Sequence, residues 1–94
     1  IDHDPDFAEA WNARATAYYM AGEFGPSVAD IAHVLTLNPR HFGALSGLAM
    51  ILESTGKPEK ALEAYRAALA IHPHLAGAVE AVERLETQEE GQEL

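Results

Sequence analysis

The feature that most constrains this chain is an internal repeat with a period of 34 residues. Residues 11–39 and residues 45–73 share one skeleton, and five identical pairs keep the same offset: Ala10 and Ala44, Ala15 and Ala49, Gly22 and Gly56, Leu35 and Leu69, Pro39 and Pro73. A fixed period of about 20 to 50 residues is typical of solenoids, whose repeats stack side by side to bury a continuous core. The sequence therefore predicts stacked, equivalent units.

Each unit has the pattern of a helical hairpin. In the first unit, apolar residues recur at the 3–4 spacing of an amphipathic helix over residues 7–20, with Asp6 as its predicted N-cap. Gly22 supplies the left-handed backbone conformation that ends many helices. A second helix is expected from about Phe24 to Leu37, because the residue before Pro39 is pushed out of the α region.

The second unit repeats this plan and a fifth helix follows it. We expect helices over residues 41–54 and 58–71, separated by a turn at Gly56. The fifth helix, over residues 74–88, keeps the 34-residue register only briefly, because Glu83 then falls where the second unit has Ala49. A helix that buries one face and exposes the other is typical of the cap of a repeat array.

This spacing resembles the tetratricopeptide repeat. The first copy matches the family at Trp11, Ala15, Tyr18, Gly22, Phe24 and Pro39; the second matches at Leu45, Leu48, Ala49, Leu52, Gly56, Ala61, Tyr65, Ala68 and Pro73. The chain departs from the pattern at Arg14, which replaces the usual Leu, at Ser27, which replaces Ala, and at Pro58. The resemblance implies an all-α fold of antiparallel helix-turn-helix repeats, which form a right-handed superhelical solenoid segment.

The repeat register divides one domain into segments. We predict a single domain over 1–94, with a tail of a preceding repeat (1–5), repeat 1 (6–39), repeat 2 (40–73), a capping helix (74–88) and a disordered acidic tail (89–94). Ile1 and Pro5 lie 34 residues before Leu35 and Pro39. We therefore expect that the chain belongs to a longer protein and that its first helix has a neighbour there.

The composition argues against several kinds of partner. The formal net charge is −9, and only six basic residues are scattered along the chain. Nucleic-acid binding needs clustered Lys and Arg, so we expect no nucleic-acid partner. The absence of cysteine excludes disulfide and thiol chemistry. No apolar run has the length of a membrane span, so we predict no membrane insertion, and the compartment stays open.

No residue pattern points to catalysis, a metal or a cofactor. The five histidines show no metal-ligand spacing, and His72 and His74 flank a proline turn. The acids are dispersed, and none is paired with a nucleophile or a Gly-rich phosphate loop. We therefore predict that the chain is not an enzyme and holds no metal or cofactor.

The resemblance also implies a binding surface. In tetratricopeptide proteins, the first helix of each pair lines a concave groove that holds a partner peptide. Carried over by spacing, the predicted groove residues are Glu9, Asn12, Thr16, Tyr19, Met20, Ser46, Gly47, Met50 and Glu53. Asn12 and Thr16 can bond a peptide backbone, Tyr19 is a flat anchor, and the methionines adapt to varied shapes. With acids at Glu9 and Glu53 and no Lys or Arg, this groove is not expected to clamp a terminal carboxylate.

We therefore predict a protein-interaction module, part of a larger protein, that binds a peptide or helix in its groove. One alternative is a structural segment that self-associates, with a homodimer formed through the exposed face of the first helix. A second alternative is a non-catalytic module of an enzyme. The sequence does not distinguish these three readings.

Overall fold

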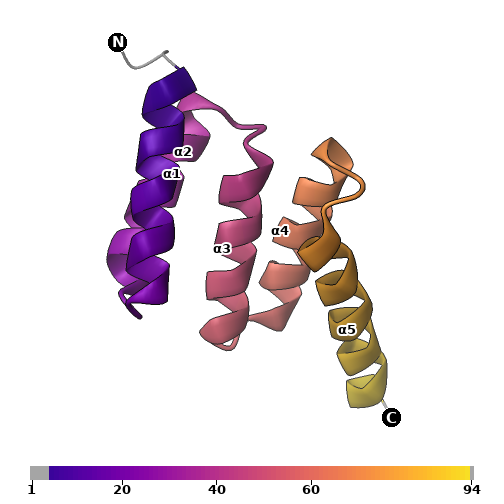
Figure 1. The fold of residues 1–94 in the computed structure, drawn as a ribbon. Coiled ribbons are helices and arrows are strands. Elements are labelled where there is room, and N and C mark those ends of the chain that lie inside the picture. Colours follow the sequence, from indigo (N-terminus) through magenta and orange to yellow (C-terminus); the bar gives the residue numbers. More distant parts are fainter. Residues whose placement is uncertain (1–4, 94) are drawn as a thin grey trace.

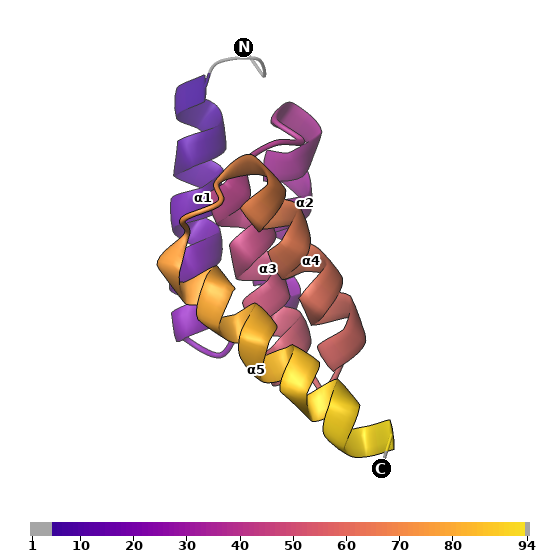
Figure 2. The same ribbon diagram turned by 90° about the vertical axis from the view of Figure 1, so that its right-hand side faces the viewer.

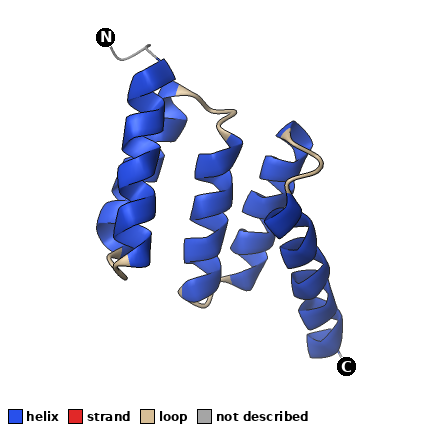
Figure 3. Cartoon of the chain, viewed as in Figure 1, coloured by secondary structure: helices blue, strands red, loops and turns tan. Residues whose placement is uncertain are grey.

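The structure is a computed structural model that describes residues 5–93, with side chains described for residues 7–88. The helices are α1 (Pro5–Met20), α2 (Phe24–Leu37), α3 (Phe42–Ser54), α4 (Pro58–Ile71) and α5 (Ala76–Glu93). Residues 5–93 contain no strand (Figure 3). The all-α prediction is therefore confirmed.

The helices form two antiparallel hairpins and a cap. Helix α1 pairs with α2 and α3 pairs with α4, and the second hairpin stacks beside the first (Figure 1). Figure 2 shows α1 on one side of the molecule and α2 and α4 on the other, with α3 between them. Helix α5 packs on α4, and its C-terminal end projects beyond the second hairpin. The first helices of the two hairpins, α1 and α3, are in contact with each other.

Both hairpin turns are built around a glycine. Gly22 and Gly56 have φ values of +79° and +78°, which is the left-handed region that glycine adopts without steric cost. After Gly22, the amide of Glu23 donates to the carbonyl of Tyr18 at 2.8 Å, and the corresponding bond in the second turn has the same length. These bonds satisfy carbonyls at the helix ends. The predicted role of the two glycines is confirmed.

Three of the five helices have ends that differ from the prediction. Helix α1 begins at Pro5, so Asp6 lies inside it and is not the N-cap; proline fits a first helical position because its missing N–H has no partner there. Helix α3 begins one residue after His41, whose side chain caps it. Helix α5 runs from Ala76 to Glu93, whereas the prediction placed it over residues 74–88. Apart from Pro5, the predicted tail of a preceding repeat lies outside the described residues.

The core consists of two hydrophobic clusters. The first joins α1, α2 and α3 through Ala8, Ala15, Ile31, Val34, Ala44 and Ile51. The second joins α3, α4 and α5 through Ala49, Ala61, Leu62, Tyr65, Ala78, Ala81 and Leu85. Many of these residues are alanines, which let the helix backbones approach closely. Helix α3 contributes to both clusters and is the wall that they share.

An ion pair joins α1 to α2 at the position where the repeat pattern is broken. The guanidinium of Arg14 donates to both carboxylate oxygens of Asp30 at 2.8 Å. The Asp30 side chain is only 4% exposed, whereas that of Arg14 is 56% exposed and lies over the ring of Trp11. Hydrogen bonds from Arg14 lower the pKa of Asp30 below its usual value. Arg14 therefore holds the two helices together by a charged contact in place of the usual leucine contact.

Candidate peptide-binding groove

A small hollow lies between α1, α2 and α3. It has a volume of about 70 Å³, and its walls come from the following residues: Asn12, Ala15, Thr16, Tyr19, Ser27, Ile31, Gly47 and Met50. Five of these, Asn12, Thr16, Tyr19, Gly47 and Met50, are predicted groove residues. The repeat spacing thus brings together, on one surface of α1 and α3, side chains that are far apart in the sequence.

The floor of the hollow is held by buried contacts. The buried hydroxyl of Ser27 donates to the carbonyl oxygen of Ala15 at 2.7 Å, which ties α2 to α1 below the hollow. The ring of Tyr19 stacks on Phe24 with centroids 5.5 Å apart. The aromatic wall is therefore fixed by the hairpin itself and does not depend on a ligand.

A wider recess adjoins the hollow at the N-terminal end of α3. It has a volume of about 460 Å³ and is lined by Glu9, Asn12, Asn38, Arg40, His41, Phe42 and Gly43. Asn12 lines both cavities, so the hollow and the recess are neighbours.

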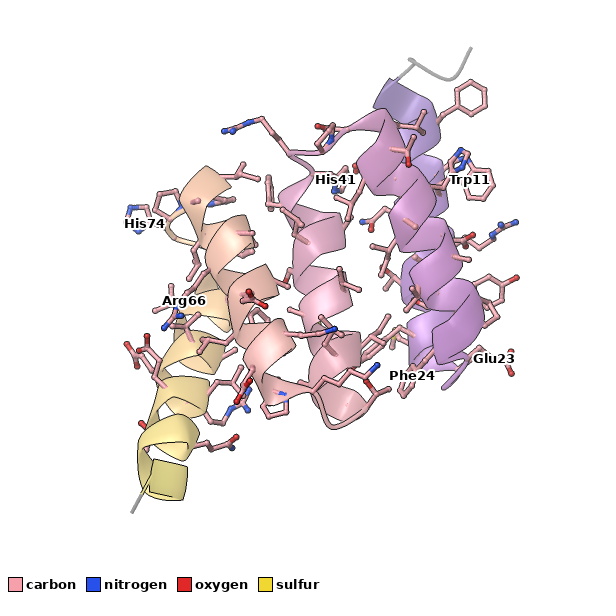
Figure 4. All side chains as sticks on the ribbon, turned by 180° about the vertical axis from the view of Figure 1, so that it is seen from behind. Trp11, Glu23, Phe24, His41, Arg66 and His74 are labelled. Atoms are coloured by element: carbon pink, nitrogen blue, oxygen red, sulfur yellow. The ribbon has the colours of Figure 1, made fainter. Side chains whose placement is uncertain are left out.

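His41 links the two repeats at this recess. Its Nδ1 accepts a hydrogen bond from the amide of Ala44 at 3.0 Å, which caps α3, and its Nε2 bonds the carboxylate of Glu9 on α1. Figure 4 shows His41 at the connection between α2 and α3. Because Nδ1 accepts, the Nε2 atom carries the proton toward Glu9. Glu9, a predicted groove residue, is therefore already bonded within the chain.

Glu53 is also engaged within the chain. Arg84 of α5 forms an ion pair with its carboxylate, and the Tyr65 hydroxyl donates to it at 3.3 Å. The hydrogen bond from Arg84 lowers the pKa of Glu53, and burial raises the pKa of Tyr65 to about 12. Glu53 thus anchors the capping helix to α3, a contact that the groove prediction did not include.

Three predicted residues, Met20, Ser46 and Glu53, lie outside both cavities. Met20 is 80% exposed at the end of α1, and Ser46 is partly buried on α3. Neither lines the hollow or the recess.

Sequence reasoning missed the residues that lie beneath and beside the groove. The sequence indicated only a core position for Ile31, which also forms part of the floor of the hollow. His41 was placed inside the third predicted helix, whereas it lies directly before α3 and caps it. Among the side chains at 7–88, no three His, Asp or Glu residues converge as a metal site would require.

The comparisons with known proteins agree with this architecture. A family model described as tetratricopeptide repeat matches residues 42–75. A TPR repeat-containing protein of Rhizobium etli is 49% identical over 69 residues, which are 73% of this chain and 34% of that protein. The small glutamine-rich tetratricopeptide repeat-containing protein 2 of Saccharomyces cerevisiae is 36% identical over 58 residues, 62% of this chain and 17% of that protein. The chain thus spans about a third or less of these relatives.

A solved structure shows the same fold. The crystal structure of MamA protein superposes with a TM-score of 0.80 over 87% of this chain and 45% of that one, at 24% sequence identity. Stacked antiparallel hairpins and a capping helix define the class of helical-repeat proteins. Within this class, the chain carries a tetratricopeptide repeat, which the family model matches at residues 42–75 and which also names the relatives that it resembles.

The match to this family indicates the general kind of function. Tetratricopeptide repeats generally mediate protein–protein interactions and are typically non-catalytic. None of the helices in residues 5–93 is long and apolar enough to cross a membrane.

Proposed function

We propose that this chain is a protein-interaction module that holds a peptide or helix of a partner protein against α1 and α3. The observation that carries the proposal is the hollow, where five predicted groove residues of two repeats line one cavity. Rigid walls reduce the entropy lost on binding, and here Tyr19 is already stacked on Phe24.

The chemistry of the groove supports a partner that does not depend on a terminal carboxylate. No Lys or Arg lines the hollow. Arg84, which could attract a carboxylate on the α5 side, is already paired with Glu53. Ala15, Ile31 and Met50 instead offer apolar contact, so burial of apolar surface is the main expected source of affinity.

Binding is tested with Tyr19→Ala and Met50→Ala, using wild-type chain and a random library of hexapeptides that are acetylated and amidated at their ends. Met20→Ala is the matched control for Met50→Ala, because Met20 is exposed and outside the hollow. We expect each groove variant to weaken selected peptides by about tenfold or more, as anchor residues do, and the control to bind normally. Folded groove variants that bind every selected peptide as tightly as wild type would refute the proposal.

A second candidate function is self-association through the outer face of α1. The stretch 10–22 contains none of the 15 acidic residues, although the chain carries a net charge of −9. Ala10, Ala13 and Ala17 are exposed on this helix. Two copies could therefore approach there without like-charge repulsion. Light scattering tests this: a concentration-dependent dimer that Ala13→Glu dissociates supports self-association, and a monomer at all concentrations rejects it.

A further inference from the structure

Gly47 is an unusual residue for its position in the wall of the hollow. It lies within α3, where a glycine is less favourable than an alanine because it loses more backbone freedom on folding. A Cβ atom built on Gly47 would meet only Cδ1 of Ile31, at the ordinary contact distance of 3.6 Å. Packing within the chain therefore does not require a glycine here.

The neighbouring Gly43 shows what a packing requirement looks like. A Cβ atom on Gly43 would lie 3.1 Å from Cε1 of His41 and 3.4 Å from Nδ2 of Asn12, so these side chains would have to move. At Gly47, the added carbon would instead project over Ile31, which also lines the hollow. The missing side chain of Gly47 thus leaves part of the hollow open.

The volume of the hollow limits what can enter it. It measures about 70 Å³, roughly half of the 150 Å³ apolar cavity that is known to accept a benzene molecule. The end of an aliphatic side chain therefore matches this volume better than a complete aromatic ring does. A methyl group on Gly47, close in size to a water molecule of about 30 Å³, would fill a large part of this space.

Two hydroxyl groups that line the hollow are already bonded within the chain. The hydroxyl of Ser27 donates to Ala15, and that of Thr16 donates to the carbonyl of Asn12 at 3.0 Å. The flanking carboxylates of Glu9 and Glu53 are bonded to His41 and Arg84. No charged residue lines the hollow, so nothing there would stabilise a charged side chain, and burying such a charge unpaired is costly.

We propose that Gly47 determines the specificity of the groove by leaving room for one aliphatic side chain of a partner peptide, of valine, leucine or isoleucine size. The residues beside this anchor are neutral or basic, because a chain with a net charge of −9 repels an acidic segment. This inference rests on the proposed function, since it names the class of partner that the same groove takes.

The test compares Gly47→Ala with Gly77→Ala, using the hexapeptide library described above. Gly77 is a helical glycine of α5, and a Cβ atom there would meet nothing within 4 Å. We expect peptides selected on wild type to share one aliphatic position with neutral or basic neighbours. Gly47→Ala should weaken them by about tenfold or more, the effect of a methyl group in a hydrophobic pocket, without loss of stability. Gly77→Ala should bind as wild type does.

The outcomes separate the inference from the proposed function. Two outcomes overturn the inference and leave groove binding intact. In the first, peptides bind Gly47→Ala normally but lose binding to Tyr19→Ala. In the second, the selected peptides share an aromatic or acidic anchor. A dimer of the wild type that Gly47→Ala abolishes would place a second copy in the hollow and also overturn it. If no hexapeptide binds the wild type, both proposals fall together.

Discussion

The ion pair between Arg14 and Asp30 occupies positions where the second repeat has Leu48 and Ala64. The perturbation that isolates it is Arg14→Leu, which places the residue of the second repeat opposite a buried carboxylate. The other single variant is Asp30→Ala, and the double variant has the residues of the second repeat at both positions. These changes form a double-mutant cycle in which each substitution already has a counterpart in the same fold.

The two single variants should differ strongly, because the partners differ in burial. With its donors removed, the carboxylate of Asp30, only 4% exposed, is left buried and unpaired, at a cost of about 3 kcal/mol of unfolding free energy. Protonation sets a ceiling of about 4 kcal/mol near pH 7, the free energy needed to protonate an ordinary carboxyl group there. After Asp30→Ala, the half-exposed guanidinium returns to water, so we expect a loss below about 1 kcal/mol. The double variant should approach wild-type stability.

The pH dependence gives an independent check. The pKa of Asp30 is lowered in the folded wild type, so its stabilising contribution is present above the unfolded value of about 4 and is lost as the pH falls below it. In Arg14→Leu, acid instead neutralises the unpaired carboxylate. The difference in stability between wild type and variant should therefore shrink from about pH 7 to about pH 3.

Urea unfolding followed by circular dichroism measures all four proteins. Equal losses for the two single variants, or a double variant no more stable than Arg14→Leu, would refute the reasoning. If the stability that Arg14→Leu loses relative to wild type stays constant with pH, the buried charge is not the cause of the loss.

Three further predictions concern the turns, the cap of α3 and the buried tyrosine. Gly22→Ala should cost about 1 to 2 kcal/mol because of its φ of +79°, whereas Gly77→Ala, with an open surface and no positive φ, should not destabilise; urea midpoints compare them. His41→Ala should lower the free energy of unfolding by about 1 kcal/mol, because it removes the cap of α3, and His41→Asn should restore most of this loss. Amide hydrogen exchange in the first turn of α3 measures both effects. Because the pKa of Tyr65 is raised to about 12, stability should fall as the pH rises from about 10 toward 12, and Tyr65→Phe should remove this part of the alkaline loss measured by denaturation.

The architecture was predictable from the sequence because it depends on local signals. Gly22 and Gly56 mark turns through a conformation that few other residues adopt, and Pro39 and Pro73 mark helix ends through sterics. The 34-residue offset then relates the hairpins to each other without any knowledge of side-chain contacts. The end of α5 was not predictable in this way, because an acidic, polar stretch favours solvent exposure whether or not its backbone is helical.

The side-chain contacts of the candidate groove were harder to predict. Helical spacing correctly places Asn12, Thr16 and Tyr19 on one side of α1, but it contains no information on which of their neighbours already have partners. The bonds of Glu9 to His41 and of Glu53 to Arg84 join residues 32 and 31 positions apart. Such pairs depend on how the hairpins stack, which the spacing of one helix does not specify.

The position of α3 between the two hydrophobic clusters has a mechanical consequence. Ala44 and Ile51 belong to one cluster and Ala49 to the other, and close-packed interiors transmit displacements with little compression. A displacement of α3 on its groove side should therefore also displace α5. A fluorescent dye on the exposed surface of α5 should therefore report binding in the groove.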